Sequence, residues 1–241
     1  MSGRRAVMEA LKSGRPINKI LVQESASGGG LGELLALARE QSAVVQQVPK
    51  AKLDEVAKNK SHQGVLAYVA AKPYVDLDDL IAIAKRSYPG LIVVLDGLED
   101  PHNLGSVLRS VDGAGAAGVV IPKRRAVPLT GTVSKASAGA LEHVEVARVS
   151  NMSQALDDLK KAGFWVMGAA GEANTLYTDA DLTGNIALVI GNEGTGLGKL
   201  VRERCDALIK LPMYGQVNSL NAGVATGILL YEVLRQRAAK G

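Results

Sequence analysis

Asn218, Ser219 and Asn221 are polar side chains near the start of an otherwise apolar stretch, residues 211–227. One Ser or Asn in such a place can cap a helix by accepting a hydrogen bond from a free backbone N–H. A cap explains Asn218 or Ser219, but Asn221 lies further along the expected helix and needs another role. The cluster therefore indicates either a cap with a satisfied buried amide or groups that contact a ligand.

Two more loops, polar or rich in glycine, each follow an apolar run. Residues 96–109 follow the run 91–95, and residues 191–198 follow the run 186–190. Apolar runs that alternate with helix patterns predict a parallel sheet covered on both faces. Ligands of such sheets lie beyond the carboxyl ends of the strands, so we expect all three loops at one edge of the sheet.

The alternation of strand and helix patterns predicts two α/β domains. In the first segment we expect helices at 4–13, 31–41 and 52–57 and strands at 19–22, 43–48 and 64–70. After the Pro-containing break at 71–75 we expect strands at 91–95, 118–121, 144–149, 165–169, 186–190 and 207–211. The expected organisation is a small domain over 1–72, a linker and connecting helix over 73–89, and a larger domain over 90–241.

Composition narrows the class of protein. The chain has 241 residues, 47% of them hydrophobic, which is ample for a packed core. No apolar run approaches the roughly 18 residues of a membrane span, and the first residues lack the apolar centre of a secretory signal, so we expect a cytoplasmic protein. One cysteine and three scattered histidines predict neither an intrachain disulfide nor a metal site. His62, His102 and His143 are expected to be structural, although His102 could face a ligand.

Charge is unevenly distributed along the chain. Residues 1–72 contain 11 Lys and Arg against 6 Asp and Glu, whereas the remainder is nearly neutral. This asymmetry suits a polyanion-binding module joined to a catalytic one. With one Phe, one Trp and six Tyr, stacking of successive bases on aromatic side chains is not expected. RNA, if bound, would be held through its shape and phosphates.

The glycine loop 191–198 matches neither common nucleotide-binding pattern. Lys199 is followed by Leu200 rather than Ser or Thr, which excludes a P-loop, and the even spacing of the glycines does not fit the dinucleotide fingerprint. The Glu193 carboxylate would also repel a phosphate. The loop suits close backbone approach to a ligand without phosphates.

Together, the motifs DPHNLGSVLR, LVIGNEGTGLG and LPMYGQVNSLNAGVATG, followed by LLYEVLRQR, resemble those of SpoU-type (TrmH-like) RNA ribose 2′-O-methyltransferases of the SPOUT superfamily. The resemblance covers about residues 91–237. The first segment, with GRRAVMEAL, INKILV and HQGVLAYV, resembles the L30e-like, ribosomal-protein-like RNA-binding domain found in bacterial methyltransferases of 23S ribosomal RNA guanosine.

The resemblance implies a parallel sheet whose C-terminal segment forms a deep trefoil knot around S-adenosylmethionine. Transferred by motif position, the cofactor would contact backbone at Gly191, Leu211 and Leu220, with Gly194 and Gly196 permitting close approach. The strand pattern alone does not predict a knot, because threaded chains are rare.

The resemblance also implies that a ribose 2′-hydroxyl attacks the methyl group of the cofactor. Arg109 and Asn103 match the catalytic positions of the first motif, with Asn103 expected to act from the loop and Arg109 from the helix. A guanidinium stays protonated, so we expect Arg109 to bind a phosphate and lower the pKa of the hydroxyl rather than act as a base; its alternative is a surface salt bridge. Glu193 would orient a group, face the sulfonium or sit at a helix N-terminus. Ser219 and Asn221 would position the ribose or hold the knot loop.

The implied partners are RNA and a second copy of the chain. Gly223 and Gly227 form a small-residue stripe that lets another helix approach closely, and in the family this helix contributes to a homodimer. The expected target is a 23S ribosomal RNA guanosine, with transfer RNA or an antibiotic-resistance target as alternatives. A non-catalytic RNA-binding or ribosome-assembly factor and a nucleotide-dependent enzyme are the other classes considered.

Overall fold

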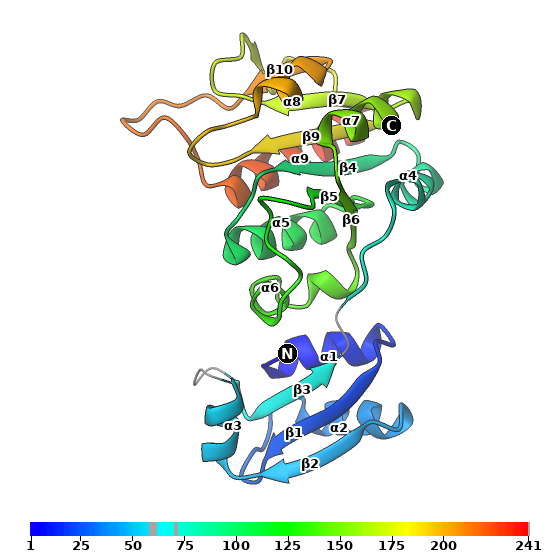
Figure 1. Cartoon of the computed structure of the whole chain (residues 1–241), viewed down its shortest axis with the longest axis vertical. Helices are drawn as coiled ribbons and strands as arrows, with labels where there is room; N and C mark the ends of the chain where they lie inside the picture. The colour runs from blue at the N-terminus through cyan, green and yellow to red at the C-terminus, as the bar shows by residue number, and fades with distance from the viewer. Residues whose placement is uncertain (58–61, 70–71, 241) are drawn as a thin grey trace. The chain divides into compact units, whose positions relative to one another are not determined.

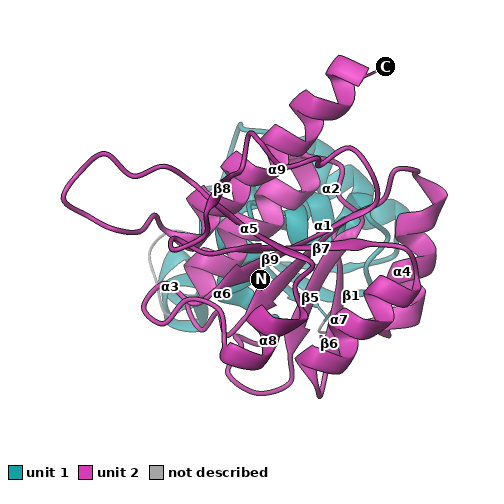
Figure 2. Cartoon of the chain, turned by 90° about the horizontal axis from the view of Figure 1, so that it is seen from above, with its two compact units in different colours: residues 1–73, 129–143 teal, residues 74–128, 144–241 magenta. Residues whose placement is uncertain are grey.

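The computed structural model describes residues 1–57, 62–69 and 72–240. They form two compact units: unit 1 comprises residues 1–73 and 129–143, and unit 2 comprises residues 74–128 and 144–241 (Figure 2). The end of the expected strand 64–70 and the start of the expected linker 71–75 lie outside the described residues.

Unit 1 is a small α/β domain built on a three-stranded sheet (Figure 1). Its elements alternate as expected: α1 (Arg4–Lys12), β1 (Ile17–Gln23), α2 (Leu31–Glu40), β2 (Val44–Val48), α3 (Lys50–Ala57) and β3 (Val65–Val69). The central strand β1 pairs in parallel with β2 and antiparallel with β3. Leu11, Ile20 and Leu34 pack in its core, so α1 and α2 are bound to the sheet by buried apolar surface.

A segment distant in sequence completes unit 1. It contains α6 (Gly131–Ala136) and the 3₁₀ helix η1 (Ala140–Glu142). Arg15 forms an ion pair with Glu142 at 2.5 Å, and the side chains of both are largely buried. Lys72 donates to the carbonyl of Leu141 at 2.7 Å. Residues 129–143, expected from the sequence to belong to the larger domain, cluster by their contacts with unit 1.

Unit 2 is built on a seven-stranded sheet in the order β6-β5-β4-β9-β7-β10-β8. All of its pairings are parallel, which confirms the predicted parallel α/β fold. The strands are β4 (Leu91–Asp96), β5 (Gly118–Pro122), β6 (Glu145–Val149), β7 (Trp165–Ala169), β8 (Thr175–Leu176), β9 (Ile186–Gly191) and β10 (Ala207–Lys210). The six predicted strands are present; the two-residue β8 was not predicted.

Helices cover both faces of this sheet. The helices are α4 (Leu77–Arg86), α5 (Pro101–Gly113), α7 (Met152–Lys161), α8 (Lys199–Arg204) and α9 (Ala222–Lys240). Leu80 of α4, Leu156 of α7 and Val201 of α8 join one buried cluster with Ile92 and Val94 of β4. Successive side chains of a strand point to opposite faces, and the other face is covered by α5 and α9, which pack against each other. None of the described helices is long and apolar enough to span a membrane.

The small-residue stripe of α9 faces α5 of the same chain. A Cβ added at Gly223 would lie 2.5 Å from Oγ of Ser106, and one added at Gly227 would lie 3.4 Å from Oγ of Ser110. The predicted close approach of another helix is therefore made within the chain. The stripe itself is not free to receive a second copy.

Candidate functional site

The three polar loops meet at the carboxyl edge of the unit 2 sheet. They follow β4, β9 and β10, and beside them lies a cavity of about 860 Å³. Its walls combine the glycine loop after β9 with the segment 211–220 and with residues just beyond β7. The expected convergence of the loops at one sheet edge is observed.

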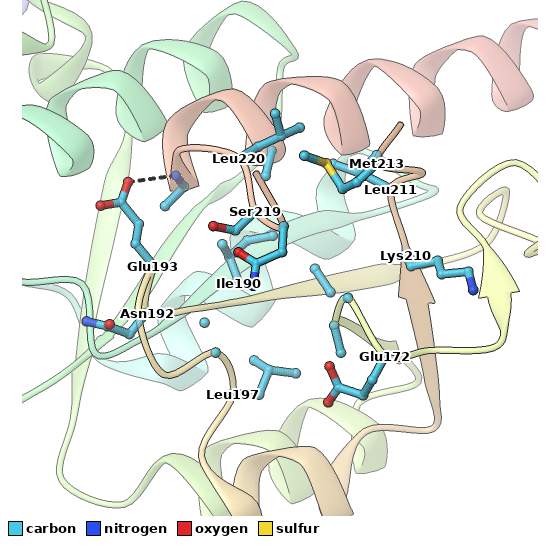
Figure 3. A pocket seen from close by; sticks show the side chains of 18 of the residues that line it. Glu172, Ile190, Asn192, Glu193, Leu197, Lys210, Leu211, Met213, Ser219 and Leu220 are labelled. Atoms are coloured by element: carbon cyan, nitrogen blue, oxygen red, sulfur yellow. Dashed lines mark hydrogen bonds between the residues drawn. The ribbon is translucent and has the colours of Figure 1, made fainter. Parts of the chain in front are cut away.

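Glu193 is the centre of a hydrogen-bonded cluster that joins all three loops. Its Oε1 accepts from Nδ2 of Asn103 at 2.9 Å and from Nδ2 of Asn221 at 2.8 Å. The backbone N–H of Ala222 donates to the same oxygen at 3.0 Å, the bond drawn as a dashed line in Figure 3. Nδ2 of Asn221 also reaches Oδ1 of Asn103 at 2.8 Å. The Glu193 carboxylate thus lies at the positive N-terminus of α9, the position foreseen among its alternatives.

Asn221 is the N-cap of α9, and the expectation that it could not be a cap was wrong. Its Oδ1 accepts from the backbone N–H of Gly223 at 3.0 Å and of Val224 at 3.3 Å. The helix begins only at Ala222, and residues 211–221 form an irregular connection rather than a first helical turn. Asn218 and Ser219 lie exposed in that connection and line the cavity.

The glycine loop is folded back on itself. Asn192 and Gly196 exchange two backbone hydrogen bonds, at 3.1 and 2.8 Å. A Cβ added at Gly191 would lie 2.5 Å from the backbone nitrogen of Leu197, so only glycine fits there. Gly196 has a φ of 66°, which favours glycine as well.

Two residues not identified from the sequence hold this loop in place. Oδ2 of Asp96 accepts from the backbone N–H of Gly198 at 2.7 Å. Nδ2 of Asn192 donates to the carbonyl of Gly97 at 2.9 Å. Each lies at the carboxyl end of a parallel strand, which is the signal that could have found them.

Each residue expected to contact the cofactor lines the cavity: Gly191, Gly194, Gly196, Leu211 and Leu220. Figure 3 shows Leu211, Leu220 and Ile190 around the hollow, with Glu193 and Glu172 on opposite sides of it. Glu172 forms an ion pair with Arg202, and both residues line the cavity; neither was predicted from the sequence.

Arg109 is the one predicted site residue that the structure does not bring to the cluster or the cavity. It is exposed on α5, and within the described residues it has no ion pair or hydrogen bond. Asn103 is buried in the first turn of the same helix, not in the preceding loop as expected, because α5 already begins at Pro101. The six-residue spacing places the two side chains on different faces, as predicted. His102, also in the first turn, is exposed.

The lone thiol offers no nucleophile to this site. Burial, reinforced by the charge of Asp206, raises the pKa of Cys205 to about 11. Its Sγ donates to the carbonyl of Val201 at 3.3 Å. Among the described residues there is also no group of three or more His, Cys, Asp or Glu side chains that could hold a metal ion.

Comparison of the sequence with known protein families identifies the class of protein to which this fold and site belong. The profile of the SpoU rRNA methylase family matches residues 90–231, and a profile for the substrate-binding domain of RNA 2′-O ribose methyltransferases matches residues 2–75. The chain belongs to the SpoU family and is an RNA methyltransferase.

Relatives match over nearly the whole chain. A TrmH family protein of Staphylococcus haemolyticus is 50% identical over 241 residues, covering 99% of this chain and 96% of the relative. The SpoU methyltransferase AviRb of Streptomyces viridochromogenes superposes with a TM-score of 0.85 at 28% identity, covering 100% of this chain and 90% of AviRb. An AdoMet-bound rRNA methyltransferase of Sinorhizobium meliloti superposes with a TM-score of 0.81 at 25% identity, covering 98% of this chain and 86% of that protein.

Proposed function

We propose that this protein transfers a methyl group from S-adenosylmethionine to a ribose 2′-oxygen of RNA, and that its target is a guanosine of 23S ribosomal RNA. The observation that carries the proposal is the cluster of Asn103, Glu193 and Asn221 beside the cavity. An anchored carboxylate next to a hollow of cofactor size can orient a reacting group at a defined place.

The cavity fits S-adenosylmethionine in size and lining. About 860 Å³ is within the range of small-molecule pockets. The side chains of Ile190, Leu197, Leu211 and Leu220 supply apolar walls for an adenine ring. Because Gly194 and Gly196 carry no Cβ, a ligand in the cavity can approach the backbone of this loop closely. When bound, the cofactor supplies an electrophilic methyl group on a positively charged sulfur.

The chain's own residues position the other reactant. Asn103 and Asn221 fix the Glu193 carboxylate, whose Oε2 has no hydrogen-bond partner in the described chain and can accept a bond from a ligand. The Ser219 hydroxyl at the cavity wall can bind a ribose oxygen. Arg109, whose planar guanidinium suits a bidentate bond to phosphate, would hold an RNA phosphate next to the target and lower the pKa of the 2′-hydroxyl. The proton would then leave to that phosphate or to a water.

The proposal includes a homodimer, a deep trefoil knot in unit 2 and an L30e-like fold for unit 1. An apolar stripe on α9 supports the dimer: Val224, Ile228 and Tyr231 are 50%, 37% and 56% exposed at helical spacing. A second copy covering this stripe could also bring its own α5 close to the site, which would give Arg109 a catalytic position. Gel filtration with light scattering at micromolar concentration should give twice the chain mass, and a monomer would contradict this part.

Ribosomal RNA is favoured over transfer RNA because the rRNA methyltransferase of Sinorhizobium meliloti aligns with both units of this chain. The test uses the full chain, tritiated S-adenosylmethionine and unmodified transcripts of 23S ribosomal RNA and of transfer RNA. We expect label in the 23S transcript at one ribose, detected as a bond resistant to alkaline hydrolysis. Label confined to transfer RNA would support the alternative target. Tight cofactor binding without transfer to any RNA would support a non-catalytic RNA-binding factor.

A further inference from the structure

The loop after β5 carries three consecutive cations, Lys123, Arg124 and Arg125, that the site described above does not use. All three are exposed, and no acidic residue occurs between Asp112 and Glu142 in the sequence. Within the described residues their side chains have no carboxylate partner. By contrast, Arg204 of the same unit pairs with Asp157 at 2.9 Å. An unpaired run of three charges repels itself and favours an anionic ligand.

The base of this loop is held by the sheet and by a stacked arginine. The backbone N–H of Lys123 donates to the carbonyl of Val149 at 2.8 Å, which extends the pairing of β5 with β6. Arg148 donates to the carbonyl of Lys123 at 3.0 Å, and its guanidinium lies 5.0 Å from the centre of the Tyr74 ring. The side chain of Arg148 therefore holds the base of the loop in place.

The other end of the loop is tied to the segment that directly follows β4. Val127 is buried, and its N–H donates to the carbonyl of Leu98 at 3.2 Å. The neighbouring Gly97 accepts from Asn192, the residue before Glu193. Between the two anchors Arg125 has a φ of 57°, a backbone conformation that costs energy for a residue with a side chain. The three cations are thus presented in a fixed place.

That place is the carboxyl edge of the sheet, where the cavity also lies. β5 pairs with β4, and β4 pairs with β9, so the loop starts two strand positions from Gly191. Two interstrand spacings amount to about 10 Å. A polynucleotide with one nucleotide at the Glu193 cluster could therefore reach these cations with a neighbouring phosphate.

We propose that Lys123, Arg124 and Arg125 form a binding site for RNA backbone phosphates that flank the methylated nucleotide. The site acts in the catalytic unit and is additional to any RNA contact made by unit 1. This inference rests on the proposed function, because it takes RNA as the substrate. Its residues bind the backbone and do not take part in the methyl transfer.

The test compares Arg124→Gln/Arg125→Gln with the matched control Lys85→Gln/Arg86→Gln in the full chain. Lys85 and Arg86 are also adjacent and exposed, but they end α4 at the opposite edge of the sheet. RNA affinity is measured by filter binding to an unmodified 23S transcript between about 50 and 200 mM potassium chloride. Affinity for S-adenosylmethionine is measured by calorimetry, and folding by thermal unfolding.

We expect the loop variant to bind RNA on the order of tenfold more weakly. The slope of log affinity against log salt should become shallower by about 1.4 to 1.8 for two lost phosphate contacts. Cofactor affinity and melting temperature should match the control, and Arg124→Lys/Arg125→Lys should keep most of the salt slope. Equal RNA affinity and equal salt slope in the two Gln variants would overturn the inference. If the wild-type chain methylates no RNA, the proposed function fails. The RNA affinities and salt slopes of the variants still show whether the loop binds RNA phosphates.

Discussion

Asn221 and Glu193 are joined by a hydrogen bond of 2.8 Å from the amide of one to the carboxylate of the other, across 28 residues of sequence. The same Asn221 side chain caps α9 through its oxygen. One amide therefore fixes both the start of the last helix and the carboxylate of the glycine loop. The geometry of the site and the stability of the fold are coupled through this residue.

Replacing Asn221 with Ala should lower both the stability of the fold and the methylation activity. The variant loses a helix cap, worth about 1 kcal/mol, and the amide donor to Glu193, so the free energy of unfolding should fall by about 1 to 3 kcal/mol. Urea unfolding measures this change, and single-turnover methylation should fall with it. Asn218→Ala is the control, because Asn218 is exposed in the same connection outside any helix. Equal stability of the two variants would show that the cap and the amide bond contribute nothing.

Arg109 separates stability from activity. Its side chain is exposed and unpaired within the described residues, so Arg109→Gln and Arg109→Lys should leave the free energy of unfolding within about 0.5 kcal/mol of wild type. Single-turnover methylation should fall strongly in the Gln variant and partly in the Lys variant, because an ammonium keeps the charge but not the bidentate geometry. If Arg109→Lys methylates at a near-normal rate with an unchanged pH profile, both a base role and a bidentate phosphate role are wrong.

Sequence predicts the parts of this molecule that local patterns determine. The runs that became β4 and β9 are apolar throughout because both faces of the central strands are buried. The start of α9 could not be chosen from the sequence, because Asn218, Ser219 and Asn221 are all suitable caps, and only the structure shows that the Asn221 oxygen accepts the capping bonds. The ion pair of Arg15 with Glu142 joins residues 127 positions apart, and no local pattern assigns residues 129–143 to unit 1. The position of Arg109 away from the cavity could not be predicted either, because a motif gives the place of a residue in the chain and not the direction of its side chain.

Cys205 should make stability depend on pH in the alkaline range. Burial disfavours the thiolate, so the pKa is raised to about 11 in the folded state, whereas an unfolded thiol titrates near 8.5. Above the unfolded value the unfolded chain has lost a proton that the folded chain retains, so the free energy of unfolding falls as pH rises from about 9 to 11. Lysines and tyrosines also titrate there, so the measurement is the difference between wild type and Cys205→Ala in urea unfolding at pH 8 and pH 10.5. The variant should lose less stability over this interval, and parallel losses would show that the thiol is not protected.

Gly223 and Gly227 should respond oppositely to the same substitution. A Cβ at Gly223 would lie 2.5 Å from Oγ and 2.7 Å from Cβ of Ser106, so Gly223→Ala forces α5 and α9 apart and should cost about 1 to 3 kcal/mol. At Gly227 the nearest atom would be 3.4 Å away, an ordinary contact, so Gly227→Ala should gain up to about 1 kcal/mol of helix propensity. Adding Ser106→Gly to Gly223→Ala removes both clashing atoms and should restore part of the loss, less the cost of a glycine within α5. Urea unfolding of these variants measures each change. Similar stabilities for Gly223→Ala and Gly227→Ala would show that α9 does not depend on close contact with α5 at its first turn.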